Sequence, residues 1–120
     1  MTWKLTIHRD STDGVAVLRV AGRLGSASSG DLVEAVQETV RGGSRRLLLD
    51  LTGVDYASSA GLMSLDAICG LVHVAQGTLV VCGLTEPVRL ALDLSGLLPN
   101  FAVEPSAAEA TARLLKLPDR

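Results

Sequence analysis

The sequence predicts an α/β fold: a single mixed, mostly parallel sheet with an N-terminal hairpin and helices packed on it, in the order β-β-α-β-α-β-α-β-α. Two observations support this class. Residues 47–51 form a nearly uninterrupted apolar run, as expected for a strand that is buried on both faces of a parallel sheet. A long helical pattern reaching about residue 76 and a second apolar strand over residues 78–82 follow. Together they make a βαβ unit, whose crossover should be right-handed.

The N-terminal part predicts the hairpin. Residues 3–8 alternate between apolar and polar side chains, as in a half-buried strand. The apolar positions on its inner face are Trp3, Leu5 and Ile7. The sequence Ser-Thr-Asp-Gly at residues 11–14 supplies a turn with a glycine that can adopt a positive φ. Residues 15–21 should therefore return antiparallel to the first strand, and the small residues 22–25 should form a loop.

A first helix is predicted from Asp31, where the apolar period changes to 3.6 residues. Its apolar stripe consists of Leu32, Ala35, Val36, Thr39 and Val40. Ser28 or Ser29 is placed to act as the N-cap, and the glycine pair at residues 42–43 ends the helix.

The central strand should be followed by a turn over residues 52–57 and then by a helix that opens with Ser58 and Ser59. The buried stripe expected on this helix is Leu62, Leu65, Cys69 and Val72, with Ile68 at its margin. The start of a helix presents free N–H groups and the positive end of the helix dipole. The two serines thus mark a place that favours an anion, including a phosphate carried on one of them.

Two further helices and a short strand complete the predicted sheet. Thr85 should cap the third helix, with Pro87 in its first turn, where a missing N–H is harmless. The apolar positions of this helix, which stops at Gly96, are Leu90, Ala91 and Leu94. Residues 101–103 form the last strand. Ser106 and the glutamate three residues later make a capping box that opens a C-terminal helix, ending near residue 117.

Composition limits the functions open to the chain. Its 120 residues, predicted to form one domain over 1–120, carry a formal net charge of −2 and only 2% aromatic residues. A base-stacking surface cannot be built from so few rings, and no basic cluster exists, so we expect no nucleic-acid binding. No apolar run approaches the ~18 residues of a membrane-spanning helix, which predicts no membrane insertion and a cytoplasmic location. Cys69 and Cys82 lack metal-ligand spacing and are expected to be buried thiols in a reducing compartment.

Independent catalysis is not predicted. Ser59 lies in a strand–turn–helix context similar to a nucleophile elbow, but such a serine needs a histidine within hydrogen-bond reach. His73 is on the same helix, about 21 Å away at ~1.5 Å per residue, and His8 lies on the first strand without an evident orienting acid. The acidic residues show no metal-ligand spacing, and no phosphate-binding glycine loop is present. We therefore expect no enzyme activity, no cofactor and no metal.

Four stretches in order resemble the STAS domain of bacterial anti-sigma factor antagonists. Gly22-Arg23-Leu24 resembles the family's Gly-x-Leu-Asp, and residues 49–56 resemble its strand leading to the switch helix. Ser58-Ser59-Ala60-Gly61-Leu62 is similar to its phosphorylation motif, commonly Asp-Ser-Ser-Gly-Leu. Asp93-Leu94-Ser95-Gly96-Leu97 is similar to its closing Asp-x-Ser-Gly-Leu. The resemblance covers residues 15–115, nearly the whole chain.

The resemblance implies a partner-switching protein whose phosphoacceptor is Ser59, with Ser58 as second choice. In such a cycle the unphosphorylated antagonist binds an anti-sigma factor, often a serine kinase with its own ATP and Mg²⁺, and a serine phosphatase reverses the modification. Gly25, Ser58 and Ala60 differ from the usual family residues, so a non-phosphorylated scaffold or a regulatory subunit of a transporter or signalling complex is the alternative. By pattern alone, both serines could also be plain helix caps.

The expected partner-binding surface surrounds Ser59. Met63 is one turn further along the outward face of the helix, where solvent would favour a charged residue. The partner-binding residues expected here are Arg23, Gly25, Tyr56, Ser58 and Met63. The pattern is equally compatible with an isolated exposed methionine and a partly buried tyrosine, and a homodimer is also possible.

Overall fold

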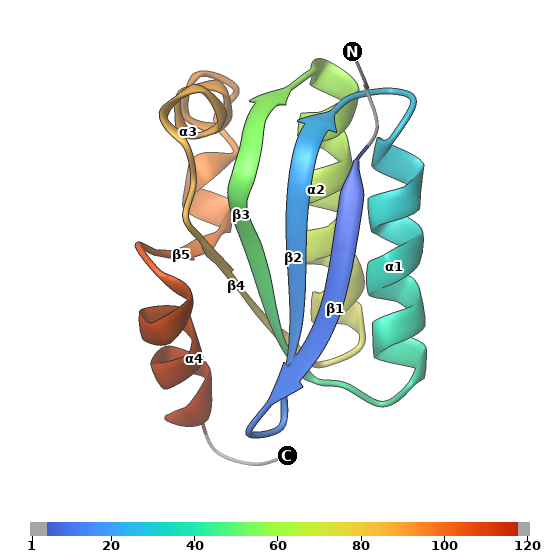
Figure 1. Cartoon of the computed structure of the whole chain (residues 1–120), viewed down its shortest axis with the longest axis vertical. Helices are drawn as coiled ribbons and strands as arrows, with labels where there is room; N and C mark the ends of the chain where they lie inside the picture. Colours follow the sequence, from blue (N-terminus) through green and yellow to red (C-terminus); the bar gives the residue numbers. More distant parts are fainter. Residues whose placement is uncertain (1–4, 118–120) are drawn as a thin grey trace.

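A computed structural model describes residues 5–117 of the chain (Figure 1). Within this range five strands form one sheet in the order β1-β2-β3-β4-β5, in which β1 pairs with β2 antiparallel and the remaining neighbours are parallel. The strands are β1 (Thr6–Thr12), β2 (Val15–Leu24), β3 (Arg46–Ala57), β4 (Thr78–Cys82) and β5 (Ala102–Glu104). The helices are α1 (Ser29–Arg41), α2 (Ser59–Val74), α3 (Glu86–Leu94) and α4 (Ala107–Leu115), with a 3₁₀ turn η1 (Leu98–Asn100). The predicted fold class and element order are confirmed.

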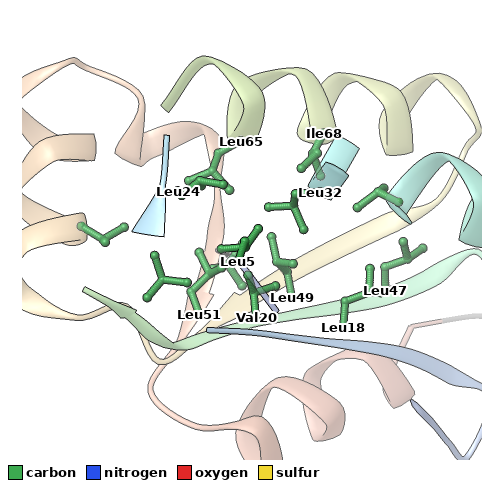
Figure 2. Close-up of a cluster of buried hydrophobic side chains, with 14 of the residues drawn as sticks. Leu5, Leu18, Val20, Leu24, Leu32, Leu47, Leu49, Leu51, Leu65 and Ile68 are labelled. Carbon is green, nitrogen blue, oxygen red and sulfur yellow. The ribbon is translucent and has the colours of Figure 1, made fainter. Parts of the chain in front are cut away.

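The helices cover the two faces of the sheet unequally. α1 and α2 lie side by side on one face, where aliphatic side chains of the sheet, α1, α2 and α3 form the main core (Figure 2). Leu47, Leu49 and Leu51 point into this core, while Leu48 points to the opposite face and packs against α4 through Leu114. A strand covered on both faces must be apolar at every position. This explains the uninterrupted leucine run in β3.

The end of β3 corrects the sequence prediction. Residues 52–57 are not a turn: the strand continues to Ala57 beside β2, with two register shifts. β2 likewise extends to Leu24, through residues 22–24 that were expected to form a loop. Gly53 allows close strand pairing rather than a turn, because a Cβ added there would lie 2.7 Å from the Cβ of Ala21.

The buried sides of two helices also differ from the prediction. In α2, Ile68 is fully buried and Cys69 is only half-buried. In α3, Val88 and Leu92 face the core, while Leu90 and Leu94 are 50% and 79% exposed. Both pairs are spaced four residues apart, and periodicity alone does not choose between two such stripes on a short helix.

The first strand has different bounds from those predicted. β1 begins and ends further along the chain than expected, and Leu5 and Ile7 face inward as predicted; Trp3 lies outside the described residues.

Of the two thiols, Cys82 is fully buried and Cys69 partly so. The prediction of a buried thiol is therefore confirmed for Cys82 and only partly for Cys69. Burial, reinforced by the nearby Asp50 carboxylate, raises the pKa of the Cys82 thiol to about 12.

One row of ionisable side chains crosses the sheet on the face that carries α4. Its members are register neighbours on successive strands, so they point to the same side. They are His8, Arg19, Asp50, Cys82 and Glu104. Arg19 also pairs with Asp10 at 3.4 Å, and Glu104 pairs with Arg113 at 2.9 Å. Below this row, towards α4, the face is apolar.

Candidate functional site

The candidate site lies where β2 and β3 end and α1 and α2 begin, at one edge of the sheet (Figure 1). The Ser58 backbone N–H donates to the Leu24 carbonyl at 2.9 Å. This hydrogen bond ties the start of α2 to the end of β2. The first turn of α2 is therefore held next to the end of β2, with one side facing the sheet and the other facing solvent. These are called the inward and the outward side.

Ser58 serves the helix as its N-cap. Its backbone is extended, with φ −78° and ψ 176°, and its Oγ accepts a hydrogen bond from the Gly61 N–H at 3.2 Å. The Ser58 carbonyl accepts from Leu62 N–H at 2.8 Å. The side chain is half-buried. A hydroxyl that already satisfies a helix N–H in this way is less open to modification than a free one.

Gly61 fixes the inward side of the same turn. A Cβ added at this position would collide with the Leu24 carbonyl oxygen. The Gly61 carbonyl in turn accepts from the buried Ser64 hydroxyl at 2.6 Å. Glycine is thus required because the helix backbone passes directly over the end of β2, which explains its place after the serine pair.

Ser59 lies on the outward side of the turn and is exposed. Its hydroxyl makes no hydrogen bond to any residue within 5–117. It is the first residue of a helix whose first turn contains no acidic side chain. The free N–H groups and the dipole at this end stabilise negative charge, so the turn could carry a phosphate on Ser59 without repulsion from its own carboxylates.

The loop from β2 to α1 forms one wall beside the serines. The buried Ser28 hydroxyl accepts from Gly25 N–H at 3.1 Å and donates to the Arg23 carbonyl at 2.8 Å. A Cβ added at Gly25 would lie 3.7 Å from Ser58 Oγ, an ordinary contact distance. The structure thus brings Gly25 and Ser58 together. The sequence indicated Ser28 only as a possible N-cap, and nothing in its spacing signalled that it anchors this loop.

The other predicted binding residues form two separate groups. The Arg23 guanidinium stacks on the Tyr56 ring at 4.1 Å from its centroid. Arg23 precedes Leu24, which faces the main core, so the Arg23 side chain points to the opposite side of the sheet from α2. Tyr56 is the register neighbour of Arg23 on β3 and therefore points to the same side as Arg23. Met63 is 71% exposed and borders a groove between α1 and α2 together with Ala60. A single patch containing all five predicted residues is therefore not formed around Ser59.

Neither histidine of the chain lies in the first turn of α2 with Ser59. His73 is in the last turn of α2 and His8 is on β1. Among residues 5–117, no group of three or more His, Cys, Asp or Glu side chains is placed to hold a metal ion. No helix in this part of the chain is both long and apolar enough to cross a membrane.

Comparisons with known proteins agree with the fold. A family model described as the STAS domain matches residues 6–110. BtrV of Bordetella bronchiseptica, named as a candidate anti-sigma factor antagonist, is 37% identical over 109 residues, which cover 91% of this chain and 92% of BtrV. The crystal structure of an anti-sigma factor antagonist from Mycobacterium paratuberculosis matches with a TM-score of 0.84 and 25% identity, covering 94% of this chain and 96% of that one. The murine anion transporter Slc26a9 matches with a TM-score of 0.78 and 18% identity, over 90% of this chain and 19% of the transporter.

Proposed function

The chain belongs to the STAS domain family, and from this premise we propose that it is an anti-sigma factor antagonist that works by phosphorylation-controlled partner switching. In the unphosphorylated form it binds an anti-sigma factor and so frees a sigma factor. Phosphorylation of Ser59 weakens that complex. The observation that carries the proposal is the contrast between two adjacent hydroxyls. Ser58 caps α2, whereas Ser59 is exposed and makes no hydrogen bond in the part of the chain that the structure describes.

Electrostatics explains why such a modification would change binding more than folding. A phosphate adds about −1.5 to −2 charges at neutral pH. At Ser59 that charge would lie at the favourable end of the helix dipole, so the fold would tolerate it. A partner surface packed over Met63 and Gly25 would instead have to bury the charge or face it, and either costs binding free energy.

The partners follow from the same proposal. The kinase is an anti-sigma factor that brings its own ATP and Mg²⁺, and a serine phosphatase restores the hydroxyl. The antagonist itself acts as a binding protein and supplies no catalytic group. The expected contacts are Gly25, Ser58 and Met63 beside Ser59, with the stacked pair Arg23 and Tyr56 contributing on the other side of the sheet edge.

A second candidate is a STAS scaffold or regulatory subunit that is not phosphorylated. Three departures from the usual family residues favour this candidate. Gly25 and Ser58 stand where the family usually has acidic residues, and Ala60 stands where it usually has the second serine. The fold is similar to that of a segment of a murine anion transporter, so this architecture also occurs within a much longer chain.

Phosphate mapping separates the two candidates. The protein is incubated with each kinase-type anti-sigma factor encoded in its genome, ATP and Mg²⁺, and the modified residue is located by mass spectrometry. We expect phosphate on Ser59, lost in Ser59→Ala and retained in Ser58→Ala. Ser59→Asp should weaken binding to the same anti-sigma factor at least tenfold, which corresponds to about 1.4 kcal/mol.

The matched control is Ala108→Asp, which places the same charge in the first turn of α4 on the opposite face of the sheet. It should leave binding unchanged. If none of the kinases modifies the protein and Ser59→Asp binds as well as the wild type, the switch is refuted and the scaffold is supported. Phosphate on Ser58 alone would contradict the assignment of the acceptor.

A further inference from the structure

The outward face of α2 is uncharged along its middle, and the exposed Asp66 and His73 lie at one margin of it. Its exposed residues at helical spacing are Ser59, Met63, Ala67, Gly70 and Val74. Met63 and Val74 are 71% and 83% exposed. The neighbouring helix α1 instead presents Asp31, Glu34, Gln37, Glu38 and Arg41 to solvent. A surface helix that keeps apolar side chains on its water-facing side is typical of a contact surface.

Gly70 lies at the centre of this face and has no role in packing the domain. A Cβ added there would meet no atom within 4 Å, and the residue is in the interior of a helix. Glycine in such a position destabilises a helix relative to alanine. Its lack of a side chain has a use only if another backbone approaches α2 closely at this point.

The order of residues on the outward face of α2 indicates which kind of partner packs on it. Met63 and Val74 are equally far from the point midway between Ile68 and Cys69, and so are Ala67 and Gly70. A twofold axis through that point pairs two antiparallel α2 helices. Each Met63 then lies opposite Val74 of the second copy, and the small residues meet where the helices cross. Self-complementarity of this kind is the requirement of a twofold interface, and an unrelated partner would not require it.

The charges on α2 fit the same arrangement. Asp66 and His73 lie on the same margin of the exposed face. In the antiparallel pair, Asp66 comes within about two residues, or ~3 Å along the axis, of His73 of the second copy. Each pair of helices thus brings two Asp66 carboxylates near the imidazoles of two His73 residues at its edges. Glu34 and Arg41 of α1, which line the groove beside Met63, would form part of a polar rim.

We propose that the protein forms a homodimer through antiparallel packing of α2 against α2 of a second copy, centred between Ala67 and Gly70. The dimer does not require a modified Ser59, which lies beyond the span between Met63 and Val74. It would cover Met63, so it would compete with the proposed anti-sigma factor for that residue. A single helix face is smaller than the ~800 Å² per partner that stable complexes bury. The dimer is therefore weak and depends on protein concentration.

Sedimentation velocity from about 10 µM to about 1 mM, a range that brackets interfaces of this size, tests the proposal. The wild type should shift from monomer to dimer across this range. Gly70→Gln should remain monomeric throughout, yet melt at a higher temperature than the monomeric wild type because glutamine is the better helix former. That rise excludes unfolding as the reason for lost association.

Four further variants test the geometry. Val74→Glu should abolish the dimer, whereas Leu94→Glu should retain it, because Leu94 is equally apolar and 79% exposed but lies on α3. Asp66→Arg alone should weaken association, and adding His73→Glu should restore it by placing opposite charges at the two positions. Three results would each overturn the proposal: a wild type that stays monomeric at about 1 mM, a dimer that persists in Gly70→Gln, or a dimer that is lost in Leu94→Glu. The first result would indicate that the outward face of α2 binds a different protein.

Discussion

The inward and outward sides of the first turn of α2 differ in how they are built. On the inward side, Ser58 caps the helix, and Gly61 lies against the Leu24 carbonyl. On the outward side, Ser59 and Met63 are exposed and Ser59 makes no hydrogen bond within residues 5–117. Two serines that are adjacent in sequence thus have separate roles. The fixed side holds the helix in place, so the chemistry of the free side can change without loss of the fold.

The largest effect should come from filling the space at Gly61. Gly61→Ala would push α2 away from the Leu24 carbonyl, and we expect it to lower the free energy of unfolding by about 1–3 kcal/mol. Urea denaturation measures this. Gly25→Ala is the matched control: its Cβ would make only an ordinary contact with Ser58 Oγ at 3.7 Å, so its effect should stay within about 0.5 kcal/mol. Equal effects at the two glycines would remove the distinction between the two sides.

A smaller effect is expected from removing the cap. Ser58→Ala leaves the Gly61 N–H without its side-chain acceptor and should cost about 1 kcal/mol of stability. Ser58→Asp, which restores a good N-cap, should return stability to near the wild-type value. Both are measured by thermal and urea denaturation. An alanine variant as stable as the wild type would show that the Ser58 hydroxyl does not support the helix.

The smallest effect on stability should occur at Ser59. Ser59→Asp places a negative charge at the start of α2, and we expect the free energy of unfolding to change by no more than about 1 kcal/mol, in the stabilising direction. The same denaturation curves show whether this holds. A loss of several kcal/mol would mean that Ser59 is part of the fixed side of the turn and could not act as a reversible switch.

Much of the fold could be predicted because local patterns and burial agree. The apolar run before Asp50 and the alternation around Leu5 identified their strands. The extent of β3 could not be predicted, because Gly53 reads as a turn residue in sequence and is needed for the approach of Ala21 in space. The buried side of α3 was wrong because Leu90 and Leu94 are as regularly spaced as Val88 and Leu92.

The candidate site was predictable in part for a similar reason. A serine pair before Gly61 marks the start of a helix, and family resemblance selects Ser59 within it. The contacts that distinguish the two serines depend on Leu24 and Ser28, which belong to another strand and its loop. Long-range backbone contacts of this kind leave no periodic signal. For the same reason the sequence did not separate the Arg23–Tyr56 pair from the groove that Met63 borders.

The ionisable row across the α4 side of the sheet has a consequence for how the molecule behaves among its own copies. Apolar surface on a sheet face that no helix covers can pack against another molecule. Dehydrating Arg19, Asp50 and their neighbours would cost more than the buried area returns. The row thus disfavours aggregation through this face, and it allows a largely aliphatic chain to leave part of the face that carries α4 without a covering helix.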